Sequence, residues 1–290
     1  MNGDKNLFTW GNVSSFMQYE EPVTEADMEV LAGKLERLQD LLFQSGRKLF
    51  VFMTPCKVRY TEAELPWIDR VMAPKEKKTG NHDALKAALS ESTVPYFDSI
   101  SWVEEHREEF DPRVPLFPRT GVHWSVYVGN LAGAAFGEFL EQESGYDLPK
   151  LRITAEPSED PVYPDADAFE TFNLLGKPYD AYYAPVIEEL EPGRDKPGVL
   201  FRGGSFMGQS LSMLIRQGYF GKDVYMENDQ FFTDAFQNKV IFHDYDAVDM
   251  QEAFRDIDLV VLEVNEPSVP SMSFGFIDYV LEHPEVLDAS

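Results

Sequence analysis

One short segment, residues 199–211, limits the folds open to this chain. It begins with the apolar run Val-Leu-Phe, passes through Gly203, Gly204 and Ser205, and continues with apolar residues at helical spacing. A buried strand that turns at once into a helix is the repeating unit of α/β proteins, whose parallel sheets lie between layers of helices. We therefore predict an α/β fold with this segment at the carboxyl end of a central strand.

Other segments repeat this alternation of helix and strand. Residues 24–44 carry apolar side chains at helical spacing, and residues 49–53 and 259–264 are short, almost uninterrupted apolar runs. Such runs are typical of strands buried on both faces. The pattern predicts three layers around a mostly parallel sheet of about five strands, in one domain over residues 1–290. Prolines interrupt residues 148–197, where we expect an irregular insertion.

Composition argues against several classes of protein. The chain has 25 basic and 51 acidic residues, a net charge of −26, which disfavours nucleic acid or anionic lipid as a partner. The single cysteine, Cys56, excludes an internal disulfide, and no cysteine cluster indicates structural zinc. We find no metal-binding pair, phosphate-binding loop or dinucleotide motif, so no cofactor is expected.

Ser205 has the placement of a nucleophile. Its hydroxyl is expected at the edge of the sheet, and its own N–H at a helix N-terminus, where an oxyanion would meet backbone donors. Serine needs a base at neutral pH, and His123, in a proline-rich loop before a predicted helix, has the side chain suited to that task. An ordinary strand-to-helix turn and a loop-stabilising histidine are the alternatives.

Further polar residues follow predicted strands. The carboxyl ends of parallel strands face the ligand crevice of an open α/β sheet, so side chains there are candidates for substrate, oxyanion or acid roles. The alternatives are that Lys57 is a surface lysine and that the other candidates have structural roles. These candidates are Lys57 and Tyr60 after residues 49–53, Asp98 after residues 94–97, and Asn265 and Glu266 after residues 259–264.

The two central motifs resemble a known family. Gly121-Val122-His123-Trp124 and Gly203-Gly204-Ser205-Phe206 are similar, in this order, to segments of the SGNH-hydrolase-like polysaccharide O-acetyltransferases, the family of alginate acetylation. Residues 49–60 resemble that family's strand with a following Pro-x-Lys, and residues 258–266 its late strand. The resemblance extends from about residue 5 to residue 285.

The resemblance implies a flavodoxin-like SGNH fold and acetyl transfer through an acetyl-serine. Ser205 would be the nucleophile, His123 the base, and the amides of Gly204 and Ser205 the oxyanion donors. The implied activity is an O-acetyltransferase or acetylesterase acting on a bacterial cell-surface or extracellular polysaccharide. The acetyl donor would come through a membrane-bound O-acyltransferase. The protein would be periplasmic or cell-surface, with an N-terminal anchor preceding the present residues 1–5, which are no signal peptide.

Two departures from the family pattern affect the catalytic acid. Gly121 stands where the family has an acid two residues before the histidine, and Gly204 stands where it has an aspartate before the serine. Asp98 and Glu266 are therefore the candidates for the third triad member. Without such an acid, Ser205 and His123 would act as a dyad, or the chain would be a catalytically impaired glycan-binding or scaffold protein of an exopolysaccharide-modification system. A secreted hydrolase of small esters is a third possibility.

Overall fold

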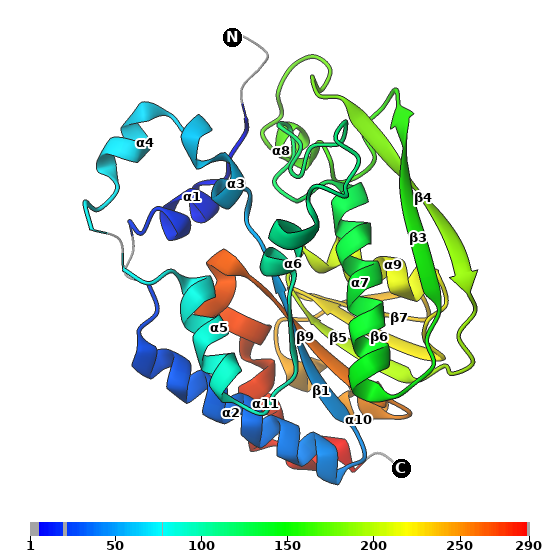
Figure 1. Cartoon of the computed structure of the whole chain (residues 1–290). Coiled ribbons are helices and arrows are strands. Elements are labelled where there is room, and N and C mark those ends of the chain that lie inside the picture. The colour runs from blue at the N-terminus through cyan, green and yellow to red at the C-terminus, as the bar shows by residue number, and fades with distance from the viewer. Residues whose placement is uncertain (1–5, 20–21, 77, 289–290) are drawn as a thin grey trace.

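The computed structural model of the chain describes residues 6–19, 22–76 and 78–288 (Figure 1). Residues 1–5, which the sequence places next to an expected anchor, lie outside this part. A seven-stranded sheet crosses the centre of the molecule in the order β2-β1-β9-β5-β6-β7-β8. The strands are β1 (Lys48–Thr54), β2 (Tyr96–Asp98), β5 (Gly198–Gly203), β6 (Lys222–Glu227), β7 (Gln230–Thr233), β8 (Asn238–Ile241) and β9 (Leu259–Asn265).

The five strands from β2 to β6 in this order are parallel, and β7 and β8 extend the sheet as an antiparallel edge. The prediction of a mostly parallel α/β sheet is confirmed. β7 lies in a part of the chain for which no strand was predicted above. Asn228 and Asp229 connect β6 to β7 as a two-residue hairpin turn, and Asn228 has the positive φ of 51° that such turns require.

Helices cover both faces of the sheet, as three layers require. In β1, Leu49, Val51 and Met53 face one core, while Phe50 and Phe52 face the other. The first core is covered by α2 (Glu25–Gln44), α5 (Asn81–Glu91), α10 (Met250–Phe254) and α11 (Phe276–Glu282), and the second by α6 (Ser99–His106), α7 (Val126–Ser144) and α9 (Met207–Arg216).

The longest of these helices begins as its sequence predicts. The Thr24 hydroxyl accepts a hydrogen bond from the Asp27 N–H at 3.1 Å, and the Asp27 carboxylate accepts one from the Thr24 N–H at 2.9 Å. This capping box satisfies backbone donors that the first turn leaves free. The apolar stripe that follows, with Leu35 and Leu38 fully buried, packs α2 against β1 and α5.

The expected irregular insertion contains regular structure, and that part of the prediction is wrong. β3 (Lys150–Ser158) and β4 (Tyr182–Glu191) form an antiparallel ribbon that packs on the outer side of α7 (Figure 1). The ribbon has only two strands, so each has a free edge where proline is tolerated. The loop between them carries the short helix α8 (Asp167–Thr171), which proves important for the site.

Short elements complete the chain. They are α1 (Trp10–Phe16), α3 (Lys57–Thr61), α4 (Trp67–Met72) and the 3-10 segments η1 (Glu62–Glu64), η2 (Tyr245–Ala247), η3 (Glu266–Gly275) and η4 (Pro284–Leu287). α3 follows β1 and η3 follows β9, so both lie at the carboxyl edge of the sheet. Among the described residues, no helix has both the length and the apolar character needed to cross a membrane.

Candidate active site

Ser205 lies in the turn between β5 and α9, at the carboxyl edge of the sheet. Its Oγ is 2.7 Å from Nε2 of His123, a residue 82 positions earlier in the chain. His123 comes just before α7, whose N-cap is Ser125, and its ring contacts Phe206 with centroids 4.6 Å apart. The structure thus brings together the two residues that the sequence singled out, each at the start of a helix.

The other ring nitrogen of His123 has an acidic partner. His123 Nδ1 is 2.6 Å from Oδ2 of Asp167, and the second carboxylate oxygen of Asp167 accepts a hydrogen bond from the Val122 N–H at 2.7 Å. An ionised Asp167 holds the proton of the ring on Nδ1, which leaves Nε2 free to accept the proton of Ser205. Ser205, His123 and Asp167 therefore have the geometry of a catalytic triad.

The close approach of α7 and α9 brings the two helix starts together. A Cβ on Gly129 would lie 2.4 Å from Cβ of Gln209, and a Cβ on Gly133 would lie 2.7 Å from the carbonyl oxygen of Ser210. Asn130 Nδ2 also donates to the carbonyl of Gln209 at 2.7 Å. Small residues on α7 thus let the two backbones touch, and this contact sets the spacing between His123 and Ser205.

The missing acid at Gly121 has a steric explanation. A Cβ on Gly121 would lie 2.9 Å from the carbonyl oxygen of Asp165, so the loop before α8 occupies the space of a side chain there. That loop is held by the Thr120 hydroxyl, which donates to the Asp165 carbonyl at 3.2 Å, and by the Phe169 N–H, which donates to the Thr120 carbonyl at 3.0 Å. Asp167, which supplies the carboxylate, follows this loop directly as the first residue of α8.

The two acids proposed from the sequence lie elsewhere, and those assignments are wrong. Asp98 caps α6 through the N–H groups of Ile100 and Ser101, at 3.1 and 3.2 Å, and pairs with His82 and Lys86. Despite its burial, these partners together hold the pKa of Asp98 well below its usual range. Because its carboxylate is fully engaged in this cluster, Asp98 is a structural residue.

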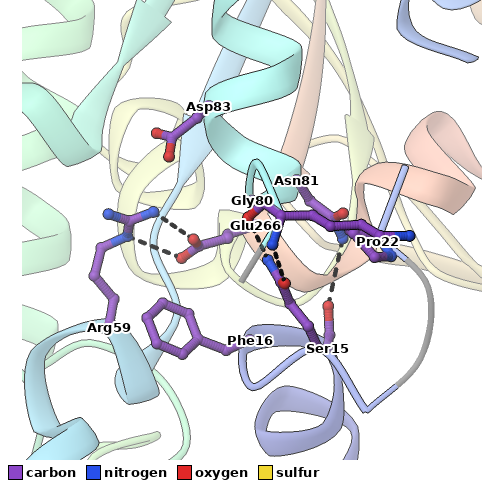
Figure 2. Close-up of a pocket in the computed structure, with 10 residues that line it drawn as sticks. Ser15, Phe16, Pro22, Arg59, Gly80, Asn81, Asp83 and Glu266 are labelled. Atoms are coloured by element: carbon purple, nitrogen blue, oxygen red, sulfur yellow. Dashed lines mark hydrogen bonds and ion pairs between the residues drawn. The ribbon is translucent and has the colours of Figure 1, made fainter. Parts of the chain in front are cut away.

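Glu266 faces Arg59 in a separate pocket (Figure 2). Its two carboxylate oxygens accept hydrogen bonds from Arg59 Nε at 3.1 Å and from Arg59 Nη2 at 2.5 Å. The pocket has a volume of about 180 Å³ and is lined by residues of α1, α3 and α5 together with Glu266, and neither Ser205 nor His123 lines it. Glu266 therefore belongs to a bidentate ion pair and does not contact His123.

Lys57 has a structural role in place of the expected substrate contact. The side chain is 1% exposed, and its Nζ donates to the backbone carbonyls of Leu7, Pro118, Arg119 and Gly121 at 2.7 to 3.0 Å. Four carbonyl oxygens around one ammonium compensate for its removal from water. Lys57 thereby fixes the loop that leads to His123.

Asn265 and Tyr60 also make structural contacts in place of the expected substrate contacts. Asn265 Nδ2 donates to the carbonyl of Pro55 at 2.7 Å and lies 3.2 Å from the Thr54 hydroxyl, which ties the end of β9 to the end of β1. Tyr60 stacks on Phe117 with ring centroids 5.7 Å apart. Its buried hydroxyl has no hydrogen-bond partner among the described residues. Neither side chain is directed at Ser205 by these contacts.

Gly204 was expected to offer its amide to an oxyanion, and the structure turns that amide inward. The Gly204 N–H donates to Oε2 of Glu263 at 2.7 Å. Of the two donors expected from the sequence, the Ser205 N–H remains. Burial raises the pKa of Glu263 to about 7, and burial also raises the pKa of Glu227, at the end of β6 beside Gly203.

Sequence reasoning missed Asp167 and Glu263. Asp167 lies 44 residues after His123, and the only local signal was the Asp165-Ala166-Asp167 sequence within a proline-rich segment. Glu263 had a clearer signal, because a carboxylate interrupts the apolar run of a strand that must be buried on both faces.

Comparison with solved structures shows which known proteins share this fold. No protein-family model and no curated protein matches the sequence. Among solved structures, the O-acetyltransferase domain of Pseudomonas putida AlgJ matches with a TM-score of 0.54 and 15% identity, over 91% of this chain and 90% of that one. Bacillus cereus PatB1 matches with a TM-score of 0.53 and 10% identity, over 84% and 90%.

Pseudomonas aeruginosa AlgX gives a TM-score of 0.56 and 11% identity, over 96% of this chain and 64% of the other. This chain shares their fold. The three-layer α/β architecture with a mostly parallel central sheet, as expected from the sequence, is thus confirmed over most of the chain. Because identities of 10 to 15% establish the fold alone, the chemistry must be argued from the site.

Proposed function

We propose that this chain is a serine-dependent O-acetyltransferase that modifies a bacterial cell-surface or extracellular polysaccharide. The observation that carries the proposal is the continuous chain of contacts from Ser205 Oγ through His123 to Asp167, at 2.7 and 2.6 Å. Three side chains from distant segments meet with the donor and acceptor order that activates a hydroxyl. The shared fold with the O-acetyltransferase domain of AlgJ supports acetyl as the transferred group.

The first half of the reaction forms an acetyl-serine. Ser205 Oγ attacks the carbonyl carbon of a donor acetyl ester while Nε2 of His123 takes the hydroxyl proton. The Ser205 N–H, at the start of α9, is placed to stabilise the oxyanion that develops. When the tetrahedral intermediate collapses, the bond to the donor alcohol breaks, and His123 returns the proton to the leaving oxygen.

The second half transfers the acetyl group. His123 removes the proton of an acceptor sugar hydroxyl, whose oxygen attacks the acetyl-serine carbonyl. The bond to Ser205 Oγ then breaks, and the proton passes back to that oxygen. Asp167 stabilises the imidazolium that exists in both halves. Water in place of the sugar would give acetylesterase activity, so transfer requires the glycan to exclude water from the site.

The setting of the reaction belongs to the same proposal. An acetyl donor delivered by a membrane-bound O-acyltransferase and an extracytoplasmic, N-terminally anchored location both fit an enzyme that acts on exported polysaccharide. The scaffold alternative depended on the absence of a catalytic acid. Since Asp167 occupies that place, we favour the enzyme.

The test compares the wild type with Ser205→Ala. We expect p-nitrophenyl acetate turnover, and acetylation of added oligosaccharide, to fall by roughly 10³-fold or more in the variant, because no other group replaces the nucleophile. Ser271→Ala, which changes an exposed serine of η3, is the matched control. Equal turnover by wild type and Ser205→Ala would refute the enzymatic proposal.

A further inference from the structure

Glu263 is a carboxylic acid buried at the centre of the sheet. It lies near the end of β9, between β1 and β5, and is 1% exposed. Along β9, Glu263 shares a face with Leu259 and Val261, which pack toward α7 and α9, so its side chain lies on the sheet face where Ser205 and His123 meet. A carboxyl group is seldom fully buried unless hydrogen bonds or charges compensate for its removal from water.

Both oxygens of this carboxyl group have partners. Oε2 accepts the hydrogen bond of the Gly204 N–H at 2.7 Å, and Oε1 accepts that of the Thr54 hydroxyl at 2.5 Å. Gly204 directly precedes Ser205, and Thr54 is the last residue of β1. The side chain of Glu263 thus connects the turn that carries Ser205 to a strand on the other side of β9.

The two glycines before Ser205 fit this arrangement. A Cβ on Gly203 would lie 2.6 Å from both Cβ and Oε2 of Glu263, so only glycine leaves room for the carboxyl group. A Cβ on Gly204 would lie 3.6 Å from Oε2, at ordinary contact distance. The Gly203-Gly204 pair, which departs from the family pattern in its second residue, is therefore compatible with an acid supplied from β9.

We propose that Glu263 is a positioning residue for the nucleophile. By holding the Gly204 amide, it fixes the turn and hence the contact of Ser205 Oγ with His123 Nε2. The inference rests on the proposed function, since it concerns how the serine is made reactive. It assigns to Glu263 a task that neither Asp167 nor any residue predicted from the sequence performs.

The surroundings give this contact a dependence on pH. The titratable groups that face Glu263 are His123 at the start of α7 and Glu227 and Tyr225 on β6. Arg202 of β5, whose side chain packs on Phe242 and Tyr245 on the other side of the sheet, also interacts with Glu263 electrostatically. Burial raises the pKa of Glu263 to about 7, so the group ionises in the range where the enzyme would work. The ionised form accepts the stronger hydrogen bond from Gly204 and holds the turn more firmly.

The experiment measures how fast an arylsulfonyl fluoride labels Ser205 in the full chain, followed by intact mass between about pH 5 and pH 9. Labelling reports on the serine alone and needs no glycan. We expect Glu263→Ala to slow labelling at least about tenfold at pH 8, because a small displacement of a nucleophile is costly. Glu266→Gln, which changes an acid directly after the same strand that is paired with Arg59, should label at the wild-type rate.

Glu263→Gln separates positioning from a merely structural role. Its carboxamide oxygen is able to accept from Gly204, and its amide nitrogen to donate to Thr54. We therefore expect labelling within about threefold of the wild type at pH 8. The loss of rate toward acid pH should be less steep than in the wild type, because one ionisation has been removed.

Three results would overturn the inference. The first is a folded Glu263→Ala that is labelled at the wild-type rate, and the second is a Glu263→Gln that is labelled as slowly as Glu263→Ala. The third is a Glu263→Gln whose labelling rate falls toward acid pH as steeply as that of the wild type. The last comparison decides the matter if Glu263→Ala does not fold. A wild-type protein whose Ser205 resists the reagent at every pH would instead refute the proposed function itself, which keeps the two failures distinct.

Discussion

Asp167 orients His123 through a 2.6 Å contact with Nδ1, and the Val122 N–H fixes the carboxylate in turn. Replacement by asparagine keeps the size of the side chain but removes the charge that selects the ring tautomer. We expect Asp167→Asn to lower kcat for p-nitrophenyl acetate by roughly 10³-fold with little change in KM, as loss of the acid does in other triads.

Asp98→Asn is the matched control for that prediction. Asp98 pairs with His82 and Lys86 and caps α6, but it does not contact His123. Its loss should lower the free energy of unfolding by about 2 kcal/mol, because partly buried hydrogen bonds to charged groups are lost. The kcat of the folded variant should stay near the wild type. A large fall in kcat for Asp98→Asn, with none for Asp167→Asn, would show that the acid has been misassigned.

Glu263 also predicts a pH dependence of stability. Its pKa is raised from 4.5 to about 7 in the folded protein, so the native state holds a proton that the unfolded chain releases. The resulting stabilisation is complete below about pH 4.5 and is lost as pH rises through 7. Glu263→Gln abolishes this titration. Between pH 5 and pH 8, the unfolding free energy of the variant relative to the wild type should therefore rise by about 3 kcal/mol.

Chemical denaturation of both proteins at the two pH values measures this difference, and the subtraction removes the contribution of other groups. One such group is Asp165, whose pKa burial also raises to about 7. A difference that does not change with pH would mean that Glu263 is ionised to the same degree in the folded and unfolded chains.

How far single residues could be predicted depended on whether their signal is local. Ser205 and His123 each lie in a short motif whose backbone context already suggests chemistry. Asp167 reaches the site only because the loop before α8 folds back over Gly121. Lys57 was found by its position at a strand end, but its role was misjudged, since no pattern in the sequence shows the four carbonyl oxygens that surround it.

Among the secondary-structure elements, α7 and α9 matter most, because each begins next to a triad residue. Gly129→Ala would place Cβ 2.4 Å from Cβ of Gln209 and push the helices apart. We expect it to lower the free energy of unfolding by about 2 kcal/mol and the activity by about tenfold or more, as overpacking and misplacement of catalytic groups do.

Gly33→Ala on α2 controls for the change of residue type, because nothing lies within 4 Å of the Cβ it would add. It should leave activity unchanged and raise helix stability slightly. Thermal unfolding and p-nitrophenyl acetate turnover measure both variants. Wild-type activity in Gly129→Ala would show that the helix contact does not set the distance between His123 and Ser205.

The sequence predicted those elements whose periodicity is strong. The capped helix α2 and the buried strands β1, β5 and β9 match their patterns closely. The ribbon of β3 and β4 was missed because prolines within a segment usually indicate that a strand is interrupted. Here they are tolerated because each strand of the ribbon has one unpaired edge. β7 was missed because a four-residue segment with two adjacent aromatic residues fits a turn, a helix or a strand equally well.

At the scale of the whole molecule, the order of the parallel strands places the ends of β5, β1 and β9 side by side. The nucleophile follows β5, and the carboxyl group that holds its turn comes from β9. The loop leading to the base is fixed by Lys57, which follows β1. An α/β sheet was predictable from alternating helices and buried runs, and the site was predictable only in part, since its acid comes from outside that repeating pattern.

The most direct measurement is the intact mass of the protein after brief incubation with an acetyl donor such as p-nitrophenyl acetate, followed by peptide mapping. We predict one added acetyl group on the peptide that contains Ser205, absent in Ser205→Ala and formed far more slowly in Asp167→Asn. Protein that turns over the donor without acetyl on Ser205, or that carries acetyl only on other residues, would contradict the account.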